Sequence, residues 1–548
     1  MDPYAEWESS QIDPDVPFHA SSHHHHHTWA KTYHSFPQLY IQPRTTQEIR
    51  KVVTLAQRCR RRLVVVGCAH SPSDLTCTSS WMVNLDHYNK LLTIDKSSHR
   101  VTMQAGIRLS DLIARLKENG LAMPNLGSID NQSIAGAFAT ATHGSSTRHG
   151  LLSQSVLSLK IMLANGRELQ CAPDKHPDLF SAALVSLGAL GIITEVVFQA
   201  VPAFKIQWSQ SLHPLQDIIS DWEKGLWSRA EFTRVWWLPY KKKVVRWRAD
   251  KTDEDIRLPS STPWTGTLGF HTYHTLLYIS TWFPRILPVL ESFVLRVQYG
   301  FTYDGAHTTA VQEGQSGLLM NCLYSQFVNE WAIPLERGPE ALTRLSAWLH
   351  GDQETSRIPY DLNGIYVHAP IEVRVTDTSI NPGTRPYLDS TVPSGPTLYL
   401  NATLYRPYNT DPPCRKRYYE AFEWLMKELG GRPHWAKNFS TVTKDEIHSM
   451  YPQMGEWLRV RHEVDPDGLF VGDWHRRLIL PTSQGELPLR FEERRSRVEA
   501  AKTGGLNWFG QLPTTSSSPH SSEESFDMID GAEAMKSGTV PVGAGETK

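Results

Sequence analysis

A histidine follows a short apolar run and several small residues early in the chain. The segment is Val64-Val-Val-Gly-Cys-Ala-His-Ser-Pro-Ser-Asp74. Small residues allow backbone N–H groups to approach a phosphate or a ring closely. His70 therefore follows the predicted strand at a place where it could serve a bound group, or it could be an ordinary histidine of a solvent-facing turn. The spacing is not G-x-G-x-x-G, so a nicotinamide site is not supported.

A second segment, residues 125–146, consists almost entirely of small or hydroxylic residues. Such a run makes a poor core element. It could wrap a phosphate well, because it offers many backbone, serine and threonine donors with little steric bulk. A tightly packed turn is the alternative interpretation.

An acid and a base lie two positions apart in residues 367–375. Ile371, Val373 and Val375 alternate with Glu372 and Arg374, which is typical of a strand. Alternate side chains of a strand point to the same face, so Glu372 and Arg374 are expected to lie side by side. If that face lines a pocket, the pair could bind and polarise a polyol. A surface ion pair is the alternative.

The elements that must position these groups mix helix and strand signals. Thr45 is predicted to cap a helix, and a second helix over 110–119 is predicted to end at Gly120. An Asn165-Gly166 turn predicts a hairpin over 157–171. Residues 178–187 indicate a further helix, and residues 205–430 mix helices with long alternating strands. Further strands are predicted at residues 63–66, 81–85, 100–105 and 192–200.

Composition excludes several classes of protein. The chain has 548 residues, of which 40% are hydrophobic and 20% are charged, as expected for a globular protein of several domains. The net charge of −2 gives no case for nucleic-acid binding. Six scattered cysteines without a C-x-x-C motif suggest neither a disulfide framework nor a zinc site, so no metal is expected. No secretory signal is apparent, and an intracellular location is expected.

Residues 269–297 are the candidate segment for membrane association. The segment is rich in apolar residues, but it contains Arg285, Glu291 and two prolines. A spanning helix needs roughly 20 mostly apolar residues, so a soluble helix and loop is favoured. Interfacial attachment and a membrane span remain the alternatives.

The two ends of the chain differ from its centre. Residues 1–35 are interpreted as a flexible extension, in which His23–His27 is low-complexity coil. Residues 483–548 are rich in Ser, Thr, Glu, Gly and Pro, and they are expected to be disordered beyond about Gly504.

Taken in order and spacing, these motifs resemble the vanillyl-alcohol-oxidase flavoprotein superfamily. Within it, residues 30–480 look like the sugar-1,4-lactone oxidases, especially the fungal branch acting on D-arabinono-1,4-lactone. Family members often have glycine where this chain has Cys68 and Ala69. The matching segments begin at Gly67, Asn125, Ser133, Ala141, Leu190, Glu372, His434 and Asp465.

The resemblance implies an α+β fold with FAD as cofactor. It places a PCMH-type FAD-binding domain at residues 36–204, a cap built on an antiparallel sheet at 205–430, and a segment completing the site at 431–482. His70 would be bonded to the flavin. The other residues implied in FAD binding are Val66, Gly67, Cys68, Ala69, Ser71, Gly127, Ser133, Gly136, Thr140, Thr142, His143, Gly144, Ser145, Gly191 and Ile193. Residues 66–71 and 133–145 would wrap the pyrophosphate.

The same resemblance implies the catalytic residues Ser128, Glu372, Arg374 and Lys437. Glu372 and Lys437 are both candidates for the base that takes the C2 hydroxyl proton of an aldono-1,4-lactone, while Arg374 would hold its oxygens. The product would be an ascorbate-type ene-diol. Gly127 precedes Ser128 where an alanine would hinder oxygen, which implies O₂ as acceptor and H₂O₂ as product. Gly127 could instead satisfy a turn with positive φ.

Alternatives follow from the same fold. The chain could be a lactone or alditol dehydrogenase with another acceptor, or a non-catalytic flavin-fold scaffold. The expected partners are a sugar lactone and O₂, without nucleic acid. The resemblance also implies association with the mitochondrial outer membrane, with a cytoplasmic location as the alternative.

Overall fold

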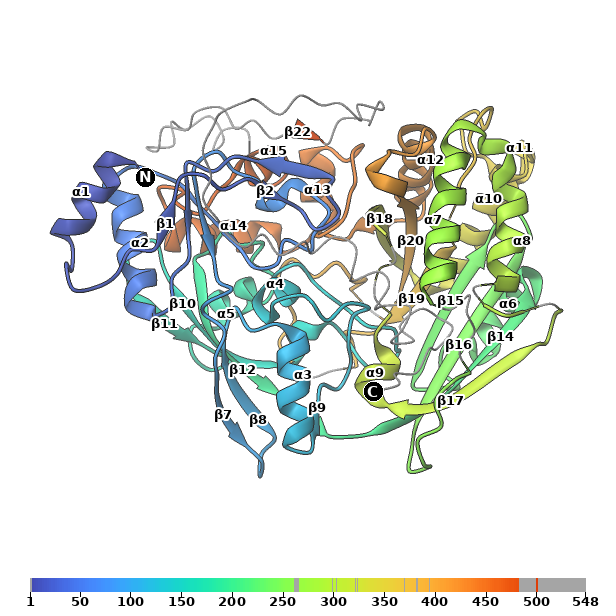
Figure 1. Ribbon diagram of the computed structural model, residues 1–548, viewed down its shortest axis with the longest axis horizontal. Coiled ribbons are helices and arrows are strands. Elements are labelled where there is room, and N and C mark those ends of the chain that lie inside the picture. The colour runs from blue at the N-terminus through green and yellow to red at the C-terminus, as the bar shows by residue number, and fades with distance from the viewer. Residues whose placement is uncertain are drawn as a thin grey trace.

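The structure is a computed structural model that describes residues 2–260, 266–297, 299–301, 303–320, 322, 324–368, 370–380, 383–393, 395–481 and 499–500. The predicted disordered tail after Gly504 lies outside these residues. The fold is α+β, as expected, with a first part that carries several small sheets and a second part built around one large sheet (Figure 1).

The first part contains a sheet of order β1–β4–β6–β5, in which β4 and β5 both run parallel to β6. The strand predicted before His70 is β5. Helix α2 (Thr46–Arg58) begins where expected, because the Thr45 side chain accepts a hydrogen bond from the Glu48 N–H. The strands are β1 (Ala20–Ser21), β4 (Leu39–Ile41), β5 (Leu63–Val66) and β6 (Trp81–Asn84).

A second, antiparallel sheet has the order β11–β10–β12–β8–β7. The predicted hairpin is confirmed as β10 and β11. Helix α5 (Pro177–Ala183) ends before the predicted Leu187, because Leu187 and Gly188 both adopt positive φ and turn the chain. The remaining elements are β7 (Leu91–Asp95), β8 (Arg100–Gln104), α3 (Leu109–Glu118), β9 (Leu121–Ala122), α4 (Ile134–Ala139), β10 (Val156–Met162), β11 (Glu168–Cys171), β12 (Ile192–Gln199) and β13 (Val201–Pro202).

The second part contains an eight-stranded sheet of order β17–β14–β16–β15–β19–β20–β18–β21. Its strands pair antiparallel, as expected for the cap. They are β14 (Lys205–Pro214), β15 (Phe232–Leu238), β16 (Lys243–Thr252), β17 (His307–Glu313), β18 (Gln326–Pro334), β19 (Ile371–Thr376), β20 (Thr397–Tyr405) and β21 (Arg432–Pro433).

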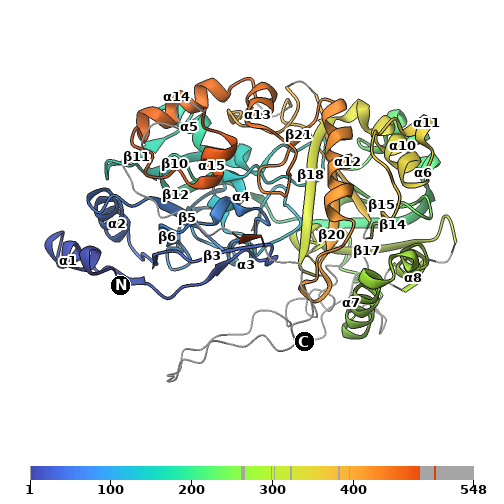
Figure 2. The same cartoon turned by 90° about the horizontal axis from the view of Figure 1, so that it is seen from above.

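Helices flank this large sheet. Helices α7 and α8 lie on one side, and α6, α10 and α11 lie on the other (Figure 2). No helix of the described residues is both long and apolar enough to cross a bilayer. The helices are α6 (Leu215–Asp221), α7 (Thr267–Trp282), α8 (Leu287–Val297), α9 (Gly314–Leu318), α10 (Gly338–Leu349), α11 (Gln353–Ser356) and α12 (Arg415–Glu428).

The last described helices return to the first part of the molecule (Figure 1). The Leu63 N–H donates to the Leu469 carbonyl at 2.8 Å, so residues after the cap extend the surroundings of β5. His475 Nε2 lies 2.8 Å from the Leu187 carbonyl. These helices are α13 (Lys444–Met450), α14 (Met454–Val464) and α15 (Asp473–Leu478).

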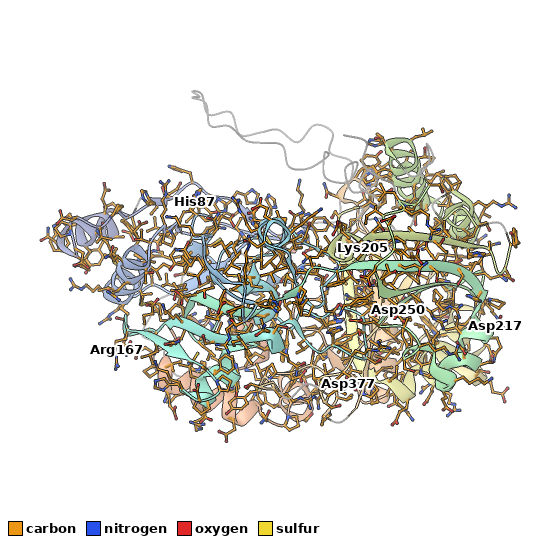
Figure 3. The ribbon with its side chains drawn as sticks, turned by 90° about the horizontal axis from the view of Figure 1, so that it is seen from below. His87, Arg167, Lys205, Asp217, Asp250 and Asp377 are labelled. Carbon is orange, nitrogen blue, oxygen red and sulfur yellow. The ribbon has the colours of Figure 1, made fainter. Side chains whose placement is uncertain are left out.

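Strand β19 connects the two parts. Near its end, the Ser146 N–H donates to the Val375 carbonyl at 2.8 Å, and the Val375 N–H donates to Ser145 Oγ at 3.2 Å. Along the horizontal axis of Figure 3, Asp377, directly after the strand, is labelled between Arg167 of the first part and Asp217 of the second part. The strand that carries Glu372 and Arg374 is therefore anchored to Ser145 and Ser146 of the first part.

The interpretation of residues 1–35 as a flexible extension is wrong for the described residues. Helix α1 (Pro3–Gln11) is followed by strands β2 (His26–His27) and β3 (Tyr33–Ser35), to which β22 (Glu499–Ala500) also pairs. His26 is 4% exposed and the ring of His24 stacks on Tyr40 at 3.7 Å, so these two histidines of the run are packed. Sequence composition did not show these packing partners.

Candidate active site

A cavity opens between the first part and the large sheet. Strand β19 contributes Glu372 and Arg374, and β20 contributes Asn401, Thr403 and Tyr405 at every second position. The Glu372 and Arg374 side chains are 16% and 7% exposed. They form an ion pair in the cavity wall, so the surface-pair alternative is not supported. The polar residues of the cap thus converge on one space.

A second cavity adjoins the first, and His70 and Gln132 line both. Many residues of its wall are small, and two of its glycines leave no room for a side chain. A Cβ on Gly67 would lie 2.2 Å from Ser133 Oγ, and a Cβ on Gly191 would lie 2.5 Å from the Met162 carbonyl oxygen. This glycine-walled space meets the first cavity at His70 and Gln132, and the two together fit a long cofactor such as FAD.

His70 is held at the junction of the two cavities. Its ring stacks on Trp29 at 4.7 Å, with 17° between the ring planes. Neither ring nitrogen has a hydrogen-bond partner among the described residues. Burial, together with the nearby Lys437 cation, lowers the pKa of His70 to about 3, so the imidazole is neutral at ordinary pH. A neutral ring with a free nitrogen is chemically able to act as a nucleophile.

A buried carboxylate holds the basic residues of the first cavity together. Glu330 lies 2.5 Å from Arg374 Nη2 and 3.7 Å from Lys437 Nζ. Arg374 also lies 3.4 Å from Glu372 through Nε, and its Nη1 points toward Ser128 Oγ at 3.5 Å. Two carboxylates and two cations therefore form one cluster, in which Arg374 bridges the two acids.

The charges of this cluster support one another. Burial alone would raise the pKa of Glu330, but Arg374 and Lys437 hold it well below its usual range. Burial would likewise lower the pKa of Arg374, whereas Glu330 and Glu372 raise it. Both groups are therefore charged at ordinary pH. Such fixed charges can stabilise the charge that develops during a reaction without reorganising.

Two histidines complete a possible donor set with Glu330. Nitrogens of His143 and His434 and an oxygen of Glu330 lie within 4.8 Å of one another. Arg374 and Lys437 already neutralise this carboxylate, so a third cation would be repelled. Burial lowers the pKa of His434 well below its usual range, which leaves it neutral. The arrangement favours a charge cluster over a metal centre.

The two cavities bring together all the predicted site residues except Gly144 and Ser145. Ser145 was expected near the pyrophosphate, but its hydroxyl donates to the Thr233 carbonyl and accepts from Val375, so it joins the two parts instead. The first cavity is lined by Gly127, Ser128, Thr142, His143, Glu372, Arg374 and Lys437. The second is lined by Val66, Gly67, Cys68, Ala69, Ser71, Ser133, Gly136, Thr140, Gly191 and Ile193.

Thr142 and His143, which were expected in the pyrophosphate wrap, line the first cavity with the polar residues of the cap, and their role toward a pyrophosphate stays a prediction. One expectation is corrected. Gly127 does not have positive φ, so the turn explanation for that glycine is wrong.

Several functional candidates were missed from the sequence. Trp29 lines the first cavity although it belongs to the segment interpreted as a flexible extension, and Glu330 lies in a strand that was not singled out. The alternation of Asn401, Thr403 and Tyr405 was a usable signal, because it matches that of Glu372 and Arg374. Others come from scattered segments: Gln132, Trp236, Tyr273, Tyr299, Gln326 and His475.

Comparisons with known proteins agree with this geometry. Residues 196–478 match the D-arabinono-1,4-lactone oxidase family and residues 37–172 match the FAD binding domain family. The cholesterol oxidase of Brevibacterium sterolicum superposes with a TM-score of 0.69 at 15% identity over 86% of this chain and 98% of that chain, which shows a common PCMH-type fold.

Two fungal relatives match most of the sequence. A protein of Neurospora crassa assigned as a D-arabinono-1,4-lactone oxidase is 50% identical over 92% of this chain and 95% of its own length. The D-arabinono-1,4-lactone oxidase of Yarrowia lipolytica is 39% identical over 81% of this chain and 95% of its own length. With its FAD-binding domain and its cap both matched, the chain belongs to the D-arabinono-1,4-lactone oxidase family of flavoprotein oxidoreductases.

Proposed function

We propose that the chain oxidises D-arabinono-1,4-lactone at C2, with O₂ as the electron acceptor. The observation that carries this proposal is the convergence of Glu372, Arg374 and Lys437 on the cavity that His70 joins to the glycine-walled space. Loss of a hydride from C2 and a proton from its hydroxyl gives a 2-keto lactone. Enolisation then gives the ene-diol D-erythroascorbate, and the two electrons reduce O₂ to H₂O₂.

The residues of the second cavity would hold the FAD. Bound FAD would supply the hydride acceptor and would pass the electrons to oxygen. Gly67, Ser133 and Gly136 lie together in the wall, where backbone and hydroxyl groups can approach a pyrophosphate. We place the covalent link to FAD at His70, since its ring is neutral and its nitrogens have no described partner.

The polar wall of the first cavity would bind the lactone and handle its proton. The Arg374 guanidinium would hold the lactone oxygens, since Nη1 is the nitrogen that is not paired with a carboxylate. Glu372 and Lys437 both line the cavity and both remain candidates for the base that accepts the C2 hydroxyl proton. Ser128 would contribute a hydroxyl beside Arg374.

Oxygen-consumption assays across a panel of aldonolactones and alditols test this function. We expect turnover with D-arabinono-1,4-lactone, with one H₂O₂ formed for each O₂ consumed. Faster turnover of an open-chain alditol would contradict the substrate class. Reduction by lactone with a dye acceptor, but without oxygen uptake, would make the protein a dehydrogenase.

The α7–α8 hairpin is the proposed site of peripheral membrane association. Trp282, Phe283 and Val289 are 60%, 66% and 70% exposed around the turn, where Arg285 also lies. Exposed aromatic and aliphatic residues beside a cation are suited to the interface of a bilayer. The family resemblance favours the mitochondrial outer membrane, with a cytoplasmic location as the alternative.

A further inference from the structure

Glu330 occupies a distinct position in the active site. Its side chain is 0% exposed, and it is not among the residues that line the cavity. We propose that Glu330 is a positioning residue for the oxidation: it orients Arg374 and balances the charges of Arg374 and Lys437. The inference rests on the proposed function for its substrate, but its charge-balancing role can be measured without substrate.

Strand register explains why Glu330 can reach the site. Glu330 on β18 is paired with Asn401 on β20, and Asn401 is paired with Glu372 on β19. The two carboxylates are therefore in one row across three strands, separated by an amide. Arg374 is two residues beyond Glu372, on the same face of β19, and its guanidinium reaches Glu330 across the neighbouring strand.

Two carboxylates fix the guanidinium of Arg374. Glu330 contacts Nη2 at 2.5 Å and Glu372 lies 3.4 Å from Nε, so Nη1 is directed toward Ser128. A planar guanidinium that is hydrogen-bonded to Glu330 at one edge and attracted by the Glu372 carboxylate at another has little freedom to rotate. Glu330 would therefore set the direction in which the substrate meets the cation, and such pre-organisation is most valuable in the transition state.

Charge balance is the second part of the role. Without Glu330, the buried Arg374 would keep only Glu372, and Lys437 would lose a carboxylate at 3.7 Å. His143 also faces Glu330 at 3.4 Å while its ring stacks on Tyr399 at 3.5 Å. Arg374, Lys437, His143 and His434 thus surround a single carboxylate. Its removal would leave the cluster more positive by one charge.

The test compares Glu330→Gln and Glu330→Asp in the holoenzyme. Gln keeps the shape but removes the charge, whereas Asp keeps the charge but withdraws it by about one C–C bond, roughly 1.5 Å. Glu231→Gln is the matched control, because Glu231 is also a paired glutamate, bonded to His149 and Lys251 at 2.9 Å, and it lines neither cavity.

Two measurements are needed. The first is the rate of flavin reduction by lactone, which should fall at least tenfold in Glu330→Gln and at least threefold in Glu330→Asp. The lactone concentration that gives half the maximal rate should change less than threefold in both variants. The second is the Kd of sulfite, a small anion that adds to oxidised flavin. The sulfite Kd should fall at least threefold in Glu330→Gln and should not fall in Glu330→Asp, because only the Gln variant makes the cluster more positive.

Each outcome decides between the possibilities. Reduction rates in both Glu330 variants within twofold of wild type would overturn the positioning role. A sulfite Kd that stays constant or rises in Glu330→Gln would overturn the charge-balancing role. If Glu330→Gln does not fold, the reduction rate of Glu330→Asp, which keeps the charge, still tests the positioning role. A wild-type enzyme that ignores the lactone but shows the sulfite effect would contradict the proposed function and leave the role of Glu330 supported.

Discussion

Gly127 and Thr142 face each other so closely that a Cβ on Gly127 would lie 2.9 Å from the Thr142 Cγ2 methyl. Both residues line the first cavity, and Gly127 has an ordinary φ. The glycine is therefore required by close approach. An alanine at this position would also fill space beside the proposed flavin site, so steric strain and hindrance of oxygen must be separated.

Gly127→Ala is predicted to slow reoxidation by O₂ while sparing reduction by lactone. The reason is that a methyl beside the reacting face can block a small molecule. Thr142→Ser removes the opposing methyl, so the double variant should relieve strain but still hinder oxygen. Stopped-flow measurements would give the rates of flavin reoxidation by O₂ and by an artificial dye in the single and the double variant. Normal oxygen reactivity in the double variant would exclude the gate.

His70→Ala is predicted to abolish covalent attachment of flavin. After acid denaturation, wild-type flavin fluorescence should migrate with the polypeptide on a gel, and the variant should show none there. Cys68→Ala is a suitable control, because Cys68 also lines the second cavity but has no comparable nucleophilic nitrogen. Fluorescence that separates completely from the wild-type chain would refute the covalent link.

Arg374→Ala and Lys437→Met are predicted to slow flavin reduction by ~10²–10³, as for other groups that stabilise charge in a transition state. Flavin content should change much less, because both residues line the first cavity and not the second. Rapid-mixing reduction and absorbance-based flavin counts give the two values. Wild-type reduction rates in both variants would move the active site elsewhere.

Trp282→Ser combined with Phe283→Ser is predicted to release the protein from anionic lipid vesicles. The change removes two aromatic side chains that are exposed at the hairpin turn. Trp7→Ser is the matched control, because Trp7 is 59% exposed on α1, far along the chain from the hairpin. Vesicle co-sedimentation checks the prediction, and equal binding by all three proteins would exclude the hairpin as the attachment site.

Local signals in the sequence predicted most elements of the first part and the polar face of β19. The Asn165-Gly166 turn, the Thr45 cap and the alternation around Glu372 depend on neighbouring residues, so they are visible in the sequence. The position of Glu330 is different. Its partner Arg374 is 44 residues away, and only the strand order β19–β20–β18 brings them together.

Residue type alone gave the wrong role for some residues, because the same side chain can bind a ligand or hold two parts of the protein together. Ser145 has the character of a phosphate ligand, but the structure uses its hydroxyl to connect the FAD-binding part to the cap. Trp29 follows a run of histidines, but it stacks on His70. Both roles depend on partners that are distant in the sequence, which local patterns do not specify.

Glu291→Gln is predicted to stabilise the protein increasingly as pH rises. Burial raises the pKa of Glu291 from its ordinary 4.5 to about 8, although it accepts hydrogen bonds from the Tyr240 and Lys241 N–H groups. Between these values the unfolded chain loses the proton and the native protein keeps it, so wild-type stability falls as pH rises from about 4.5 to about 8 and then levels off. Gln removes this titration. The Tm difference, variant minus wild type, should therefore grow over that range, while the exposed Glu118→Gln should give a flat difference. A difference that does not change with pH would show that Glu291 is ionised in the native protein.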